Sequence, residues 1–210
     1  MREYYAARAP EYDQVYAKPE RQQDLRAIEA WLPGRFIGRR LIEIACGTGY
    51  WTRFLAPAAS ELLATDAAPQ TLEIARRRVR SPSVQFVVAD AYRLPTRAGA
   101  FSGAFAGFWL SHVPRQRLAA FLDDLHARLA PGARVVFLDN RFVAGSSTPI
   151  SEEDAFGNTY QQRRLGDGSS HRVLKNFPSE AELTQAIGGA GIRLRHHAWQ
   201  HYWALEYLVS

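Results

Sequence analysis

The chain has 210 residues, 47% of them hydrophobic, and a formal net charge of +5. This length is sufficient for one domain with a full sheet and two helical layers. The single cysteine excludes an intramolecular disulfide. No run approaches the ~18 apolar residues of a membrane span, and Met1–Tyr5 lacks the apolar core of a signal peptide. We therefore expect a cytoplasmic protein without a membrane partner, folded as one domain over residues 1–210.

The N-terminal segment, residues 1–32, is rich in tyrosine and precedes the first predicted strand. Apolar residues recur at helical spacing over residues 20–31, which predicts a helix there. Tyr5, Tyr12 and Tyr16 have two interpretations: packing of an N-terminal helix onto the core, or a lid that closes over bound ligands. We favour the helical lid.

A short motif follows the first predicted strand. Leu41–Cys46 is an apolar run interrupted only by Glu43, and it leads into the turn Gly47–Gly49. Glycine lets backbone amides approach a ligand closely, and the N–H groups of a following helix would face the same point. Thr52 stands where the G-x-G-x-x-G fingerprint has its third glycine, which disfavours a nicotinamide cofactor.

The next predicted strands end in acidic or polar residues. Asp66 closes the second strand, where it could accept both hydroxyl groups of a ribose or simply cap a helix. Asp90 follows the third strand and could accept a hydrogen bond from an adenine amino group. All these strand ends meet at the edge where open α/β sheets bind ligands. The expected strands after the first are Glu61–Asp66, Ser83–Val88, Phe101–Phe108, Ala133–Leu138, Ile192–Trp199 and Tyr202–Val209, the last two forming an antiparallel pair.

Together these motifs resemble the class I S-adenosylmethionine-dependent methyltransferases of the small-molecule type. The resemblance implies an α/β three-layer sandwich: a seven-stranded, mostly parallel sheet with its last strand antiparallel and helices on both faces. Ala45 departs from the family pattern, which has glycine there. The segments that carry the resemblance are Glu43–Gly49, Asp66, Ala89–Ala91, Trp109–Pro114 and Leu129–Gly132.

By this resemblance the cofactor is S-adenosylmethionine, and no metal is expected. Glu43, Ala45 and Gly47 would line its methionine end. Asp66 would hold the ribose, and Asp90 with its neighbour would hold the adenine. The full set of expected cofactor-binding residues is Glu43, Ala45, Gly47, Thr48, Gly49, Trp51, Asp66, Ala67, Asp90, Ala91 and Trp109.

Methyl transfer from a sulfonium is an in-line displacement that depends mainly on positioning. A base is needed only if the nucleophile arrives protonated. His112, directly after the fourth strand, is the candidate catalytic base because its unperturbed pKa suits neutral pH. The alternative is a histidine that merely hydrogen-bonds a loop carbonyl.

Residues 142–177 form a polar insertion that is too long for a plain connection, and we expect it to lie over the active site. The turn at Gly166–Ser169 predicts a hairpin within it. Its arginines could meet a carboxylate or phosphate through bidentate contacts, whereas the alternative is a surface excursion without a role. The expected substrate-binding residues are Tyr5, Tyr12, Tyr16, Asn140, Arg163, Arg164 and Arg172.

The expected partner is a small-molecule methyl acceptor. Nucleic acid is disfavoured because the basic residues are spread along the chain and not gathered in one patch. Three alternatives stay open at this point: an RNA or protein methyltransferase, a non-catalytic S-adenosylmethionine-binding module, and a nicotinamide-dependent oxidoreductase. The sequence carries no signal for the methyl acceptor's identity or for an oligomeric state.

Overall fold

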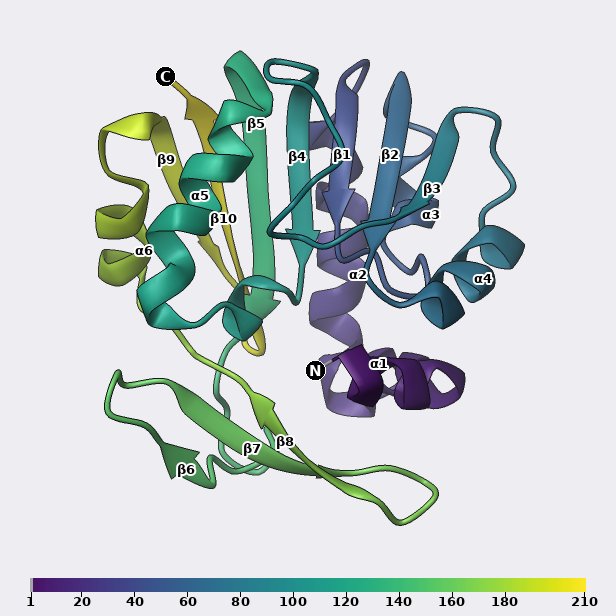
Figure 1. Cartoon of the computed structure of the whole chain (residues 1–210), viewed down its shortest axis with the longest axis vertical. Coiled ribbons are helices and arrows are strands. Elements are labelled where there is room, and N and C mark those ends of the chain that lie inside the picture. The colour runs from purple at the N-terminus through teal and green to yellow at the C-terminus, as the bar shows by residue number, and fades with distance from the viewer. Residues whose placement is uncertain (1) are drawn as a thin grey trace.

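The computed structural model describes residues 2–210, which form a seven-stranded sheet with helices on both faces (Figure 1). The strand order is β3-β2-β1-β4-β5-β10-β9. β10 runs antiparallel to both of its neighbours, while the pairs from β3 to β5 are parallel. The predicted three-layer sandwich with an antiparallel last strand is therefore confirmed.

The strands of this sheet follow the predicted order along the chain. Apolar and β-branched residues dominate the central strands, which are buried on both faces. They are β1 (Arg40–Ile44), β2 (Glu61–Asp66), β3 (Val84–Val88), β4 (Phe101–Gly107), β5 (Leu129–Asn140), β9 (Gly191–Ala198) and β10 (Tyr202–Val209).

The sheet has one hydrophobic core on each face, and successive residues of a strand point alternately into the two cores. In β5, Val136 packs into the core under α2 (Gln22–Trp31) and α3 (Thr52–Leu55), whereas Phe137 packs into the core under α5 (Leu118–Ala127) and α6 (Glu180–Ile187). α4 (Pro69–Arg78) covers β2 on the same face as α3. Within residues 2–210 no helix has the length and apolar content to cross a bilayer.

Two elements differ from the sequence-based expectation. β5 begins at Leu129, four residues before the predicted start, because Phe101 of β4 pairs with Leu129 ahead of a register shift. The helix after the first turn, α3, has only four residues. Pro57 follows it closely and has no N–H to continue the helical hydrogen bonds. A helix this short contributes little dipole to the turn.

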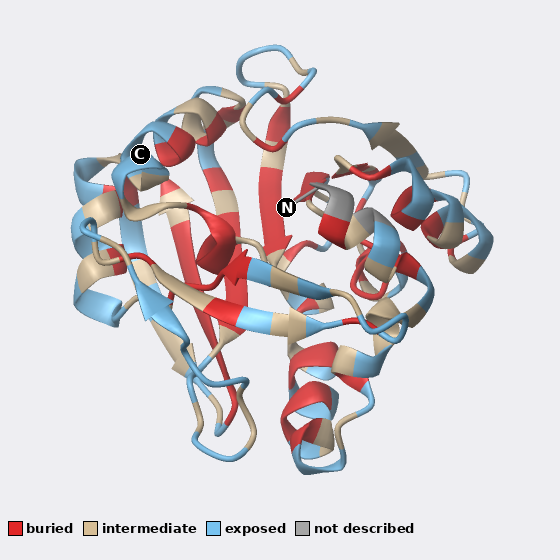
Figure 2. Cartoon of the chain, turned by 60° about the horizontal axis from the view of Figure 1, so that its bottom comes forward, coloured by how far each residue is buried: buried red, intermediate tan, exposed pale blue. Residues whose placement is uncertain are grey.

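The N-terminal segment and the insertion both lie below the carboxyl ends of the parallel strands (Figures 1 and 2). The former begins with α1 (Arg2–Arg8) and the 3-10 helix η1 (Ala9–Tyr16). The insertion folds into a second, antiparallel sheet. Its strands are β6 (Glu152–Glu153), β7 (Thr159–Arg164) and β8 (Ser170–Leu174). The predicted hairpin is confirmed, since β7 and β8 pair antiparallel across their turn.

Asn158 ties the insertion to the main domain through a fully used side-chain amide. Its Oδ1 accepts from the backbone N–H of Arg115 at 2.7 Å and from Asn176 Nδ2 at 3.2 Å. Its Nδ2 donates to Gln116 at 3.0 Å and to Asp154. The side chain is only 1% exposed. Because water cannot reach this buried amide, its hydrogen bonds have to come from protein groups, and all of them do.

Asn158→Ala should lower the free energy of unfolding by about 1–3 kcal/mol, because it removes a buried amide and leaves the half-buried Arg115 N–H without its partner. Urea unfolding measures this change, and amide exchange should quicken across the insertion. Gln162→Ala, an exposed change on the same β7–β8 sheet, is the control. Equal stability of the two variants would contradict this role for Asn158.

Candidate active site

The Asp66 carboxylate, at the end of β2, fastens the turn after β1. Its Oδ2 accepts from the Gly47 N–H at 2.9 Å. Its Oδ1 accepts from the Ala68 N–H at 2.9 Å and from Thr71 Oγ1 at 3.1 Å. Burial raises the pKa of Asp66, and these hydrogen bonds offset part of that rise. The carboxylate therefore joins the turn to the start of α4.

The turn itself uses left-handed backbone. Gly47 has φ of 56° and Gly49 has φ of 78°. At Gly49 a Cβ atom would lie 3.0 Å from the Ala75 Cβ, so glycine allows α4 to approach. Ala45 also has a positive φ, 54°, which costs an L-residue roughly 1 kcal/mol. The family's glycine at this position is explained by that backbone conformation.

A cavity of about 270 Å³, the turn cavity, lies at this carboxyl edge. Its wall runs from the β1 turn past the ends of β2 and β3 to the segment after β4. Most of the expected cofactor-binding residues are brought together there. They are Ala45, Gly47, Asp66, Ala67, Asp90, Ala91 and Trp109.

Four other expected cofactor-binding residues lie behind the cavity wall. Glu43 is 1% exposed and its Oε2 accepts from Thr52 Oγ1 at 2.7 Å. Thr48 donates to Asp13 at 2.6 Å. Gly49 faces α4, and Trp51 packs in the core under α2 and α3. Thr52, which stands where the fingerprint has its third glycine, thus donates a hydrogen bond to the Glu43 side chain. Direct cofactor contact stays a prediction for all eleven expected residues.

A second cavity of about 410 Å³, the insertion cavity, lies between the N-terminal segment and the β7–β8 sheet. The expected substrate-binding residues on its wall are Tyr5, Tyr12, Asn140, Arg163 and Arg164. The sequence did not single out four further cations that line it: Arg8, Lys18, Arg21 and Lys175.

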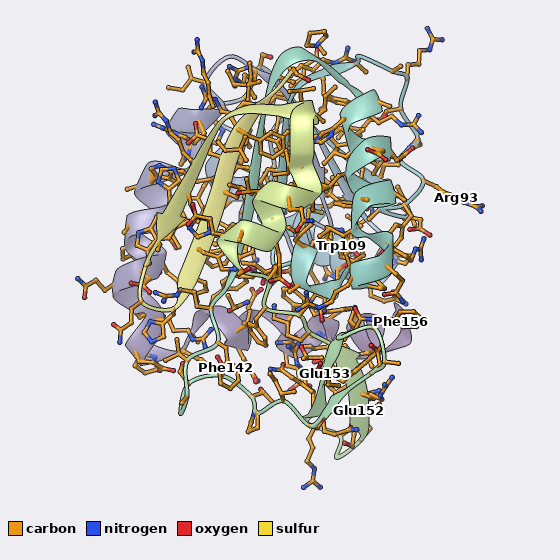
Figure 3. The ribbon with its side chains drawn as sticks, turned by 90° about the vertical axis from the view of Figure 1, so that its left-hand side faces the viewer. Arg93, Trp109, Phe142, Glu152, Glu153 and Phe156 are labelled. Carbon is orange, nitrogen blue, oxygen red and sulfur yellow. The ribbon has the colours of Figure 1, made fainter. Side chains whose placement is uncertain are left out.

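Two expected substrate-binding residues lie elsewhere. Tyr16 stacks on Tyr50, with ring centroids 3.5 Å apart, in the core under α2 and α3. Arg172 of β8 forms an ion pair at 2.7 Å with Glu152 of β6, the strand on the other side of β7. Figure 3 labels Glu152. Arg172 points to the face opposite to Arg163, because Arg163 pairs with His171 and the next residue along β8 points to the other face.

The two cavities meet at four residues that line both: Tyr5, Tyr12, Phe108 and His112. His112 Nδ1 lies 2.5 Å from the Leu174 carbonyl oxygen, and its Nε2 lies 2.8 Å from the Tyr5 hydroxyl. A carbonyl oxygen only accepts, so Nδ1 carries the proton and Nε2 accepts from Tyr5. A hydrogen bond to a backbone carbonyl, as in the alternative interpretation of His112, is therefore present, although the carbonyl belongs to the last residue of β8 and not to a loop.

The electrostatics of this junction favour neutral side chains. Burial and the charges of Lys175 and Arg163 hold the pKa of His112 well below its usual range. Burial raises the pKa of Tyr5 to about 12. At neutral pH both groups are uncharged, and the Tyr5–His112 hydrogen bond closes the junction on the N-terminal side.

Lys175 and Asp139 form a buried ion pair at the wall of the insertion cavity. Lys175 Nζ lies 2.7 Å from Asp139 Oδ1 and 2.6 Å from Ser111 Oγ, and the two side chains are 4% and 0% exposed. The ammonium group lowers the pKa of Asp139 despite its burial. Lys175 follows the insertion strand β8, so this pair fixes the insertion to the end of β5.

Comparison with known proteins identifies this arrangement. A family model described as a methyltransferase domain matches residues 41–132. The demethylmenaquinone methyltransferase of Thermus thermophilus is 32% identical over 178 residues, which cover 75% of this chain and 76% of the relative. A solved structure described as a DhpI–SAH complex superimposes with a TM-score of 0.81 at 29% identity, over 99% of this chain and 94% of that one. A DhpI–SAM–HEP complex gives a TM-score of 0.80 at 30% identity, over 98% and 94%.

The chain belongs to the class I S-adenosylmethionine-dependent methyltransferases. It is an enzyme of that class, and its cofactor is S-adenosylmethionine. The residues of the turn cavity fit this molecule. Asp66 and Asp90 supply carboxylate acceptors for hydroxyl and amino groups. Trp109 Nε1 is a buried donor with no hydrogen-bond partner among residues 2–210. When bound, the cofactor supplies a methyl group already activated by its sulfonium.

Asp66→Ala should weaken S-adenosylmethionine binding at least tenfold, because a charged acceptor for the ribose and the clamp on the Gly47 turn are both lost. Calorimetric titration measures the affinity. Glu73→Ala, an exposed carboxylate on α4, is the matched control. Unchanged affinity of a folded Asp66→Ala protein would contradict the ribose assignment.

Glu43→Gln should raise stability at high pH. Burial raises the pKa of Glu43 to about 8 from its ordinary value of 4.5. Because the folded pKa is the higher one, the free energy of unfolding falls as pH rises between these values. The glutamine amide does not ionise, so the variant should be about 1–3 kcal/mol more stable than the parent at pH 9 and nearly equal at pH 5.

Thermal or urea unfolding at both pH values measures the effect of Glu43→Gln. Glu61→Gln, an exposed change at the start of β2, should show no such pH dependence. Parallel stability profiles for the parent and Glu43→Gln would mean that Glu43 is ionised in the folded protein throughout this range.

Proposed function

We propose that the enzyme transfers the methyl group of S-adenosylmethionine to a small molecule bound in the insertion cavity, across the junction of the two cavities. The observation that carries this proposal is the set of four residues lining both spaces: Tyr5, Tyr12, Phe108 and His112. In-line displacement requires the nucleophile within about 3 Å of the methyl carbon, on the side opposite to sulfur. Because these side chains line both cavities, the cavities adjoin at this point, and an acceptor bound in one would lie next to a methyl group held in the other.

Both peripheral segments then have a role. Residues 1–32 would act as the lid and residues 142–177 as the acceptor-binding layer. Arg21 links them, since its Nη1 donates to Asn140 at 2.9 Å and its Nε to Ser146 Oγ at 3.0 Å. Closure of the lid would expel water from the junction, as methyl transfer requires.

The size of the insertion cavity favours a small acceptor over a macromolecule. Its volume of about 410 Å³ lies within the range typical of small-molecule sites. The curated relatives act on demethylmenaquinone, by their names, and the DhpI structure pairs SAM with HEP. RNA, protein and non-catalytic binding are the competing alternatives for this chain.

In this proposal the first role of His112 is to position Tyr5, and a role as a base is secondary. Its neutral ring holds Tyr5 through Nε2. A general-base role would require Tyr5 to release that nitrogen. We retain this role as a proposal for acceptors that arrive protonated. A rate that rises with pH and loses that dependence in His112→Gln would support it.

Incubation with methyl-labelled S-adenosylmethionine and a cell extract, followed by separation by size, tests the proposed function. Label should enter molecules below about 1 kDa and should be lost with Asp66→Ala. Label in RNA or protein would replace this proposal with a macromolecular acceptor. Cofactor binding without any label transfer would favour a non-catalytic module.

A further inference from the structure

The insertion cavity has a strong excess of positive charge. Its wall contains one acidic side chain, Glu11, which accepts from the Gly166 N–H at 3.1 Å. Five of its cations form no ion pair with a carboxylate within the described part of the chain, and only Lys175 has one. The cations on the wall are Arg8, Lys18, Arg21, Arg163, Arg164 and Lys175.

Arg163 is the unpaired cation that bears most directly on the junction. Its Nε and Nη2 donate to the neutral amide oxygen of Gln161 at 3.2 and 2.8 Å, so its charge stays uncompensated. Burial is the main cause that lowers the pKa of His112 and of Lys175, and the charge of Arg163 adds to it. Arg163 lines the same cavity as the junction residues Tyr5, Tyr12 and His112.

Positive charge on both sides of the junction favours an anion between them. The sulfonium of S-adenosylmethionine bound in the turn cavity would lie on one side of the junction, and Arg163 and Lys175 line the insertion cavity on the other side. Like charges facing each other across a water-poor gap repel strongly. An anionic oxygen placed between them interacts favourably with both, and a guanidinium suits carboxylate and phosphate geometry.

We propose that the acceptor presents an oxyanion, a carboxylate or a phosphate or phosphonate group, to Arg163, and that the methyl group goes to one of its anionic oxygens. This inference rests on the proposed function of the junction. The O–CH₃ bond forms as the S–CH₃ bond breaks, and the bonding pair returns to sulfur. The products are a methyl ester and neutral S-adenosylhomocysteine, and no proton is released.

This chemistry matches the state of His112. An oxyanion is already deprotonated at neutral pH, so its methylation requires no general base. A buried imidazole with a depressed pKa is then free to hold the Tyr5 hydroxyl. The residue most responsible for acceptor specificity would be Arg163, and Lys175 would position the oxyanion while neutralising Asp139.

The test is calorimetric titration of the complex with S-adenosylhomocysteine, using benzoate, phenylphosphonate and the uncharged benzamide as probes. At least one of the two anions should bind at least tenfold more tightly than benzamide, and which one does so distinguishes the carboxylate from the phosphonate source. Arg163→Gln should weaken that anion at least tenfold. Arg172→Gln, which removes an arginine from the outer face of the same small sheet, should change it less than twofold.

Two results would overturn the inference: benzamide binding as tightly as both anions, or an anion affinity that is the same in Arg163→Gln as in the parent. Failure of S-adenosylhomocysteine to bind would instead contradict the cofactor assignment, so the two failures are distinguishable. A merely structural role of Arg163 is also separable. In that case Arg163→Gln would weaken benzamide as much as the anions.

Discussion

The buried ion pair between Lys175 and Asp139 holds the active site together. Burial of two charges is favourable only when geometry and additional hydrogen bonds compensate for lost hydration. Here Ser111 supplies them, with its hydroxyl on Lys175 and its N–H donating to Asp139 Oδ2 at 3.0 Å. Because Lys175 follows the insertion and Asp139 ends β5, the pair joins an added layer to the carboxyl edge of the main sheet. Together with the hydrogen bonds of Asn158, the pair fixes the position of Arg163 relative to the junction.

At this edge of the sheet, the two cavities differ in the charge of the side chains that line them. The turn cavity has carboxylates, Asp66 and Asp90, and small residues around the turn, which suit a neutral nucleoside with a cationic sulfonium. The insertion cavity has cations. A hydrogen-bonded pair of uncharged groups, Tyr5 and His112, lies between them. In the proposed account, the two carboxylates lie beside the cofactor and the cations lie beside the acceptor, because the strand ends supply one cavity and the N-terminal segment and the insertion supply the other.

The sheet and the turn cavity could be predicted because strand ends and small residues follow regular spacing. The insertion cavity could not. Lys175 lies in a polar segment, where lysine is normally solvated, and only the preceding apolar pair Val173–Leu174 signalled that the chain turns inward there. Tyr12 and Tyr16 share a face in an α-helix, but η1 is a 3-10 helix, in which a four-residue spacing separates them.

The central claim is that methyl transfer occurs where the two cavities meet. A crystal structure of the enzyme with S-adenosylmethionine tests it most directly. The adenosine should lie between Asp66 and Asp90, with the sulfonium methyl directed at the opening bounded by Tyr5, Phe108 and His112. A methyl group directed into the protein core, or toward solvent away from the insertion, would contradict this account.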